Sequence, residues 1–336
     1  MRGRTMSVLM VVTALAAVVV GGAAGARQEA RLNLVAYSTP KPVLSKIISA
    51  YQSTPAGSGV SFTQSYGGST AQAQSVVNGQ PADLVFLSTG SDVNLLVDHG
   101  LVDRNYDKQS YKGVAANSVV VFAVRDGNPK KIKSWNDLLK PGVEVVTPNP
   151  FTAGIAKWNI LAAYGAQRHL GKTDKQAVAF VKKLFEHVVS QDSSGSNATN
   201  TFLSGKGDVL ITFESEAINA RLAGRDIQYV IPRQTMLIEL LVAALKKSPN
   251  KAAATAFIRY MKSHPAQVLF GQNGFRPIEP AAAKQFQKQY PVRPGMFTID
   301  DKVIGGWRAV DKKWFNPTSS IMATIEKNLG VSTSGA

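Results

Sequence analysis

Short runs of β-branched and aromatic residues alternate along the chain with segments of helical periodicity. This alternation is typical of repeated strand–helix–strand units and predicts an α/β fold with a largely parallel sheet. The helical period is clear between residues 177 and 188, behind an N-cap at Thr173 or Asp174. The best strand candidates are residues 32–37, 60–65, 83–88, 119–124, 143–147, 208–213 and 237–245.

No linker rich in proline and serine divides the chain into domains. Two extended stretches, around residues 117–124 and 229–241, could instead cross between two lobes, which would make both lobes discontinuous. The predicted division places residues 27–116 and 236–292 in lobe I, and residues 117–235 and 293–336 in lobe II. A cleft between the lobes would then be the natural binding site.

The first 26 residues have the composition of an export signal. Arg2 and Arg4 precede an apolar run at residues 8–20, and the small residues 24–26 form a cleavage site. The alternative is an uncleaved anchor, because no charged residue lies between Arg4 and Arg27. We expect cleavage near Arg27 and a periplasmic or other extracytoplasmic location.

Composition removes several classes of function. The 336 residues include no cysteine, which excludes disulfides, thiol catalysis and cysteine-bound metal sites, and no cofactor is expected. There are 38 Lys and Arg against 22 Asp and Glu, a net charge of +16 that would attract anions. The basic residues occur in scattered pairs without a nucleic-acid-binding motif, so a solvated basic surface is expected and nucleic acid is not an expected partner.

Four turns rich in Gly, Ser and Thr join a predicted strand to a helical segment. They lie at residues 38–40, 66–70, 147–154 and 193–197. A helix start has unpaired N–H groups and a partial positive charge, so it can hold an anion without a Lys or Arg side chain. Each turn alone is also explained as an ordinary capped helix, but four facing one cleft would form an oxyanion receptor.

Catalytic patterns are weak. His99, His169, His187 and His264 lie far apart and are expected at the surface or at helix ends, while the Walker-like stretch 165–173 has the wrong spacing. Glu214 and Glu216 could form an acid–base pair, although salt bridging or solvation explains them more simply. A hydrolase with Ser69 as nucleophile would lack a base, and a surface-interaction protein is a third alternative. We expect no enzyme.

Nine segments in order resemble the periplasmic sulfate/thiosulfate-binding proteins that supply ABC importers. They are residues 64–69, 121–129, 135–142, 147–150, 157–159, 199–202, 207–210, 297–300 and 305–307. The resemblance covers nearly the whole chain after the signal. It implies the type II periplasmic-binding-protein fold, in which two α/β lobes, each a mixed and mostly parallel sheet flanked by helices, close about a two-strand hinge. It also implies a monomer and a membrane permease as partner.

The resemblance further implies that neutral donors hold a dehydrated sulfate or thiosulfate. These would be the Ser69 hydroxyl, backbone amides near Ser38, the amides of Gly154 and Ile155, and the amide of Gly195. Every oxygen of a buried dianion needs a hydrogen bond, which such fixed donors provide. A pocket of donors alone would reject protonated phosphate, whose O–H needs an acceptor.

Four positions depart from the family's pattern. Ala153 stands where the family usually has a donor Ser, Phe213 where it has Trp, Ser196 where it has Arg, and Ser38 where it has Asp. Donors could come instead from Thr39, Thr152 or Ser88. Another tetrahedral oxyanion, or a sulfonate whose apolar tail rests on Phe213, remains an alternative ligand. The candidate site comprises Ser38, Thr39, Ser69, Thr152, Ala153, Gly154, Ile155, Gly195, Ser196 and Phe213.

Overall fold

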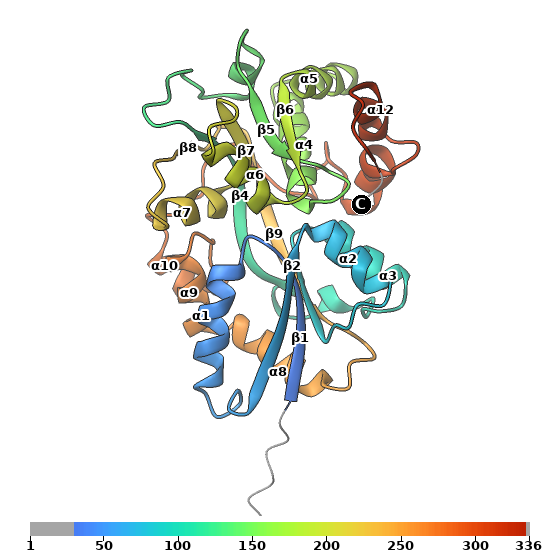
Figure 1. Cartoon of the computed structure of the whole chain (residues 1–336), viewed down its shortest axis with the longest axis vertical. Helices are drawn as coiled ribbons and strands as arrows, with labels where there is room; N and C mark the ends of the chain where they lie inside the picture. The colour runs from blue at the N-terminus through green and yellow to red at the C-terminus, as the bar shows by residue number, and fades with distance from the viewer. Residues whose placement is uncertain (1–29, 334–336) are drawn as a thin grey trace, which may run out of the picture.

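The computed structural model describes residues 30–333, and the predicted export signal lies outside them. In this range the strands follow the order β2-β1-β3-β9-β4-β7-β5-β6, with β10 beside β9 and β8 beside β4. Figure 1 shows an elongated molecule of two halves, stacked along its long axis. We name them the β1–β3 half and the β5–β7 half after the parallel strands that each contains.

The β1–β3 half is built on strands that run in the same direction. β1 (Ala30–Tyr37) lies between β2 (Val60–Gly67) and β3 (Leu84–Leu87) and pairs in parallel with both. Helices flank this sheet (Figure 1). They are α1 (Lys41–Gln52), α2 (Ser69–Val77), α3 (Gly90–Asp98), α8 (Lys251–Met261), α9 (His264–Gln272) and α10 (Pro280–Gln285).

The β5–β7 half repeats this plan. β5 (Val145–Pro148) pairs in parallel with β6 (Val188–Asp192) and β7 (Val209–Phe213), and the short β8 (Gln228–Val230) and β10 (Met296–Phe297) complete the half. The helices are α4 (Gly154–His169), α5 (Asp174–Glu186), α6 (Gly195–Leu203), α7 (Glu214–Leu222), α11 (Trp307–Val310) and α12 (Ile321–Asn328).

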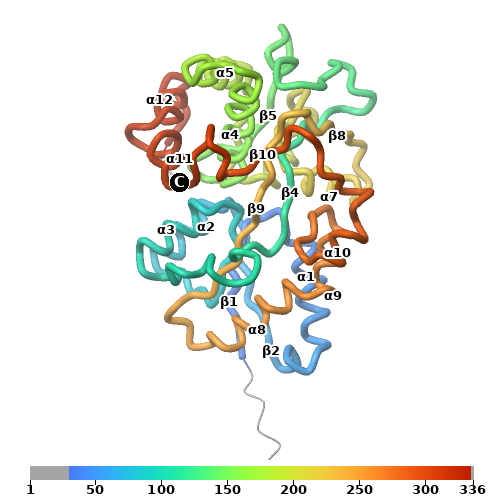
Figure 2. Tube along the Cα trace, turned by 180° about the vertical axis from the view of Figure 1, so that it is seen from behind, coloured from blue at the N-terminus to red at the C-terminus, as the bar shows by residue number. Residues whose placement is uncertain are grey.

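Two long strands pass from one half to the other, as predicted. β4 (Val114–Val124) pairs with β9 (Thr235–Ala244) up to Val119 and with β7 from Val120 onward, always antiparallel. Figure 2 shows both strands from behind, crossing the region between the two halves, which we call the waist. The fold is therefore α/β with mixed sheets flanked by helices. The division of the chain at residues 116, 235 and 292 stays a prediction.

A buried carboxyl group lies under the last helix. Glu326 of α12 has no exposed surface and accepts a hydrogen bond of 2.8 Å from Gln191 of β6, while its other oxygen has no partner among the described residues. Burial raises the pKa of Glu326 from 4.5 to about 7, against the smaller effect of the Gln191 bond. Because the folded protein holds this proton more tightly than the unfolded chain, the contribution of Glu326 to stability is greatest below pH 4.5 and is lost as the pH rises to 7.

Glu326→Gln is therefore expected to stabilise the protein at pH 8, by about 2–3 kcal/mol, and to have little effect at pH 5. Thermal unfolding of both proteins at the two pH values measures the difference, with the exposed Glu186→Gln as control. An equal effect of Glu326→Gln at both pH values would show that the carboxyl does not titrate in this range.

Candidate functional site

Helix starts from both halves face each other across the waist. α1, α2 and α3 follow β1, β2 and β3, and α4, α6 and α7 follow β5, β6 and β7. Since the carboxyl ends of parallel strands lie at one edge of a sheet, the helices of each half begin on the side that faces the other half (Figure 1). Their first N–H groups have no carbonyl partner within the helix.

The backbones of the two halves meet at the start of α2. The amide of Ala71 donates to the carbonyl of Thr152 in the other half at 3.1 Å. Gly68, the N-cap of α2, comes so near that a Cβ atom there would lie within 3.0 Å of the carbonyl oxygens of Thr152 and Ser193. Only glycine fits this approach, so the two halves are in a closed arrangement.

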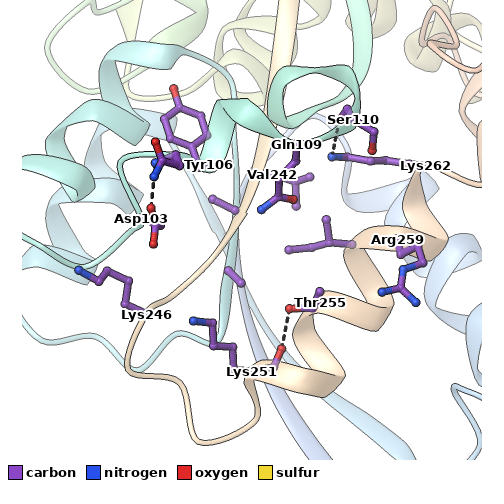
Figure 3. A pocket seen from close by; sticks show the side chains of 14 residues that line it. Asp103, Tyr106, Gln109, Ser110, Val242, Lys246, Lys251, Thr255, Arg259 and Lys262 are labelled. Atoms are coloured by element: carbon purple, nitrogen blue, oxygen red, sulfur yellow. Dashed lines mark hydrogen bonds between the residues drawn. The ribbon is translucent and has the colours of Figure 1, made fainter.

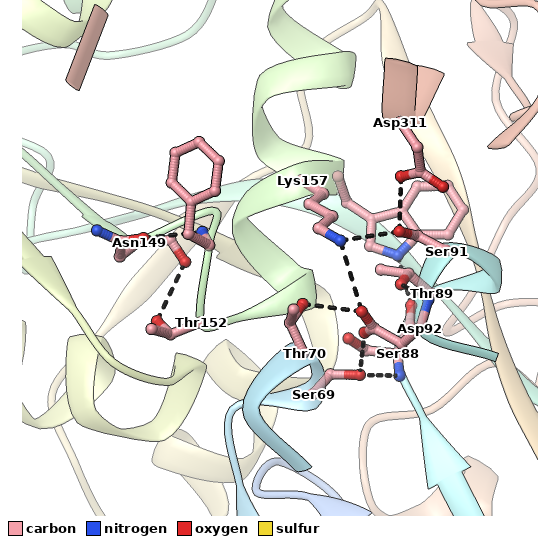
Figure 4. Close-up of polar contacts among 12 residues, drawn as sticks. Ser69, Thr70, Ser88, Thr89, Ser91, Asp92, Asn149, Thr152, Lys157 and Asp311 are labelled. Atoms are coloured by element: carbon pink, nitrogen blue, oxygen red, sulfur yellow. Dashed lines mark hydrogen bonds and ion pairs between the residues drawn. The ribbon is translucent and has the colours of Figure 1, made fainter. Parts of the chain in front are cut away.

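The buried carboxylate of Asp92 accepts hydrogen bonds from two hydroxyl groups at the start of α2. Ser69 Oγ donates to Asp92 Oδ2 at 2.5 Å and accepts from the Ser88 amide at 2.9 Å, while Thr70 donates to Asp92 Oδ1 at 2.8 Å (Figure 4). Ser69 and Asp92 are both buried. The single hydroxyl proton of Ser69 is thus directed at Asp92.

Lys157 of α4 reaches across the waist to the same carboxylate. Its Nζ atom lies 3.5 Å from Asp92 Oδ1 and donates to Ser91 Oγ at 2.8 Å, and Ser91 donates in turn to Asp311 at 2.6 Å (Figure 4). Burial raises the pKa of Asp311, against the opposing charge of Lys157. This network fixes α3 of the β1–β3 half to α4 and to the segment after α11.

The start of α4 lies against the Ser88 hydroxyl group, which has no hydrogen-bond partner among the described residues. A Cβ atom at Gly154 would come within 3.0 Å of Ser88 Oγ, and Ser88 is completely buried. In the described part of the chain, Ser88 Oγ has no hydrogen-bond partner. A free donor therefore lies beside the amides of Gly154 and Ile155, which begin α4.

A second buried carboxyl group lies on the other side of the waist. Glu216 accepts hydrogen bonds from Thr39 at 2.5 Å and from Ser196 and Thr199 at 3.2 Å. Burial raises the pKa of Glu216, and these hydrogen bonds act in the opposite direction. The buried Tyr37 hydroxyl has no partner in the described chain, and burial followed by the charge of Glu216 raises its pKa. Thr39 and Glu216 join the two halves.

Gly195 connects this cluster to α4. A Cβ atom on Gly195 would lie 3.3 Å from Glu216 Oε1 and 3.1 Å from Ile155 Cδ1. The starts of α4 and α6 are therefore adjacent, with Ile155 and Glu216 between them. This position is where amides of two helices could hold one anion.

The structure brings most of the predicted site residues to the waist. The predicted residues that lie there are Thr39, Ser69, Thr152, Gly154, Ile155, Gly195 and Ser196. The Ser38 amide donates to the Gly67 carbonyl at 2.9 Å, within its own half. Ala153 and Phe213 are N-caps of α4 and α7, and both side chains pack completely buried in the core.

Sequence reasoning missed the charged groups of the site. Asp92 and Lys157 carried no predicted role, although Lys157 lies in one of the segments that resemble the family. The expectation that Glu216 is solvated is wrong, since it is buried among hydroxyl groups. Salt bridging is confirmed for Glu214, which pairs with Arg276 at 2.7 Å. The four histidines lie at helix ends, as predicted.

Residues 30–333 contain no group of three or more His, Asp or Glu side chains that could hold a metal ion. Across the same range, no helix is both long and apolar enough to span a bilayer.

Two α/β halves whose helix starts face each other form a site that can hold a small anion. Residues 32–276 match the family described as bacterial extracellular solute-binding proteins, and the chain belongs to this family. The resemblance found in the sequence is confirmed by named relatives. The sulfate-binding protein of Salmonella typhimurium is 41% identical over 279 residues, which cover 80% of this chain and 84% of that protein.

Two other comparisons agree. The thiosulfate-binding protein of Pseudomonas aeruginosa is 36% identical over 312 residues, covering 89% of this chain and 93% of that protein. The solved structure of the sulfate-binding protein SubI from Mycobacterium tuberculosis H37Rv superposes with a TM-score of 0.81 at 44% identity, covering 84% of this chain and 98% of that one. These relatives are named for binding, not for catalysis.

Proposed function

We propose that this protein is exported through its N-terminal signal and captures sulfate or thiosulfate between its two halves. It then delivers the anion, as a monomer and without chemical change, to an ABC-type permease. The observation that carries this proposal is the uncommitted Ser88 hydroxyl beside the start of α4. The names and identities of the relatives support the same class of ligand.

The anion would bind where α4 and α6 begin. The amides of Gly154, Ile155 and Gly195 supply fixed donors there, and Ser88 supplies a hydroxyl in place of the one that Ala153 lacks. Burying a dianion is favourable only when its oxygens are fully hydrogen-bonded. Fixed backbone donors meet that need with little loss of side-chain entropy, since they are already held in place by the helices.

The carboxyl groups of Asp92 and Glu216 affect the selectivity for sulfate over protonated phosphate. Asp92 already accepts from Ser69, Thr70 and Lys157. Glu216 accepts from three hydroxyl groups in the same way. Since three of the roughly four acceptor positions of each carboxyl group are already taken, neither is a ready acceptor for the O–H of a protonated phosphate, which is thereby disfavoured against sulfate.

Two serine variants test the donor assignment. Ser88→Ala is expected to weaken sulfate binding by about 1–3 kcal/mol, or roughly 5- to 150-fold in Kd, with unchanged stability because its hydroxyl has no partner to lose. Ser69→Ala is expected to lower both affinity and Tm, because Asp92 loses a donor in a buried site.

Calorimetric titration with sulfate, thiosulfate, methanesulfonate and phosphate, with thermal unfolding of the free proteins, separates the outcomes. Unchanged affinity in Ser88→Ala would remove Ser88 from the site. If none of the four anions binds the wild-type protein, the receptor proposal itself is wrong. A preference for methanesulfonate over both inorganic sulfur anions would favour the sulfonate alternative.

A further inference from the structure

A basic cavity lies in the β1–β3 half, apart from the waist. It has a volume of about 450 Å³ and is formed between the loop after α3, the end of β9 and helix α8 (Figure 3). None of the residues that line it belongs to the proposed sulfate site. Its size lies in the range of small-molecule sites.

The charges around this cavity are strongly unbalanced. Lys246, Lys251, Arg259 and Lys262 line it, against the single carboxylate of Asp103. Within residues 30–333, none of these four cations has a carboxylate partner at ion-pair distance. The cavity therefore carries a net positive charge of about +3 that the protein does not neutralise.

Lys262 is the unusual member of this group. Only 8% of its surface is exposed, and among residues 30–333 its Nζ atom makes one hydrogen bond, to the Ser110 carbonyl at 3.0 Å (Figure 3). Burial lowers the pKa of Lys262. A buried ammonium group without a counter-ion costs free energy, so its retention at the wall of a polar cavity points to an anion that would neutralise it.

The lining also indicates the kind of anion. The planar guanidinium of Arg259 can bind a phosphate or carboxylate group through two hydrogen bonds, and the lysine ammonium groups suit separate negative charges. Val242, Ala243 and Ile258 give the cavity an apolar floor. Sulfate alone would engage only a part of this surface.

We propose that this cavity is a second binding site, for a small anion that carries at least two phosphate or carboxylate groups. Lys262 holds one group at the inner wall, and Arg259 with Lys246 or Lys251 holds another nearer the rim. The site is independent of the waist, so the proposal does not rest on the sulfate assignment.

The test uses pyrophosphate and citrate as probes, with the full chain at constant ionic strength and with sulfate present at saturation. Pyrophosphate or citrate is expected to bind under these conditions and to raise the Tm. Arg259→Gln and Lys262→Met are each expected to weaken that binding by at least roughly tenfold. Lys262→Met should also raise the Tm of the free protein, because it removes a buried unpaired charge.

Lys247→Gln is the matched control, since Lys247 is on the same loop but lines a different cavity, and it should leave binding unchanged. The proposal is overturned if neither probe binds, if sulfate displaces them, or if both cavity variants bind them as tightly as the wild type. Binding of poly-glutamate without binding of either probe would assign the surface to an acidic protein segment instead. A failure of this kind would leave sulfate binding at the waist intact, so the two proposals are distinguishable.

Discussion

Gly68→Ala is expected to weaken sulfate binding by at least about 100-fold, equivalent to about 2.7 kcal/mol, while both halves stay folded. The new Cβ atom would lie within 3.0 Å of the carbonyl oxygens of Thr152 and Ser193, which belong to the opposite half. Backbone carbonyls inside a packed fold cannot move aside as a flexible side chain can. The φ of −65° and ψ of 137° at Gly68 suit alanine, so the substitution disfavours closure and not the local fold.

Calorimetry gives the affinity, and small-angle X-ray scattering with and without sulfate gives the degree of closure. Gly67→Ala is a matched control at the neighbouring position, because the atoms nearest to a Cβ atom there belong to the Gln72 side chain in its own half. Wild-type affinity in Gly68→Ala would mean that the ligand binds without the close backbone approach described for the waist.

The predicted strands were found because their patterns are local. Residues 32–37 and 143–147, for example, are short and mostly apolar runs followed by Ser38 and Pro148. β8 overlaps the start of the extended stretch predicted around residues 229–241, whereas β6 and β10 were not predicted. β6 has the sequence VVSQD and is only half buried at the edge of the sheet, and β10 has two residues, so neither carries a periodic signal.

The helix starts of the candidate site could be predicted from the sequence, but its charged residues could not. Gly, Ser and Thr at strand ends mark helix starts through backbone chemistry, and the starts of α2, α4 and α6 all lie at the waist. The roles of Asp92, Lys157 and Glu216 depend on which helices meet across the two halves. That pairing is a tertiary property, so the charged network could not be derived from the spacing of these residues.

A buried ion pair lies next to β4, one of the two strands that cross between the halves. Arg276 Nε donates to Glu214 Oε2 at 2.7 Å and Nη2 donates to Oε1 at 3.2 Å, with both side chains buried. The backbone of Arg276 also exchanges hydrogen bonds of 2.8 and 2.9 Å with Asn117 of β4. Burial raises the pKa of Glu214, and the charge and hydrogen bonds of Arg276 oppose that rise. Removing Arg276 would therefore leave a carboxylate that is costly to keep charged.

Arg276→Met is accordingly expected to lower the free energy of unfolding at pH 8 by about 3–5 kcal/mol. Without its partner the pKa of Glu214 rises further above its unfolded value, so stability is lost as the pH rises and the deficit should be smaller at pH 5. Urea unfolding at both pH values measures it, with the exposed Arg225→Met as control. The double variant Arg276→Met/Glu214→Leu should recover most of the loss, because no charge is left buried. If the double variant is as unstable as Arg276→Met and neither depends on pH, the loss comes from the packing of Arg276 and its hydrogen bonds to the carbonyls of Tyr290 and Pro291, and not from an uncompensated carboxylate.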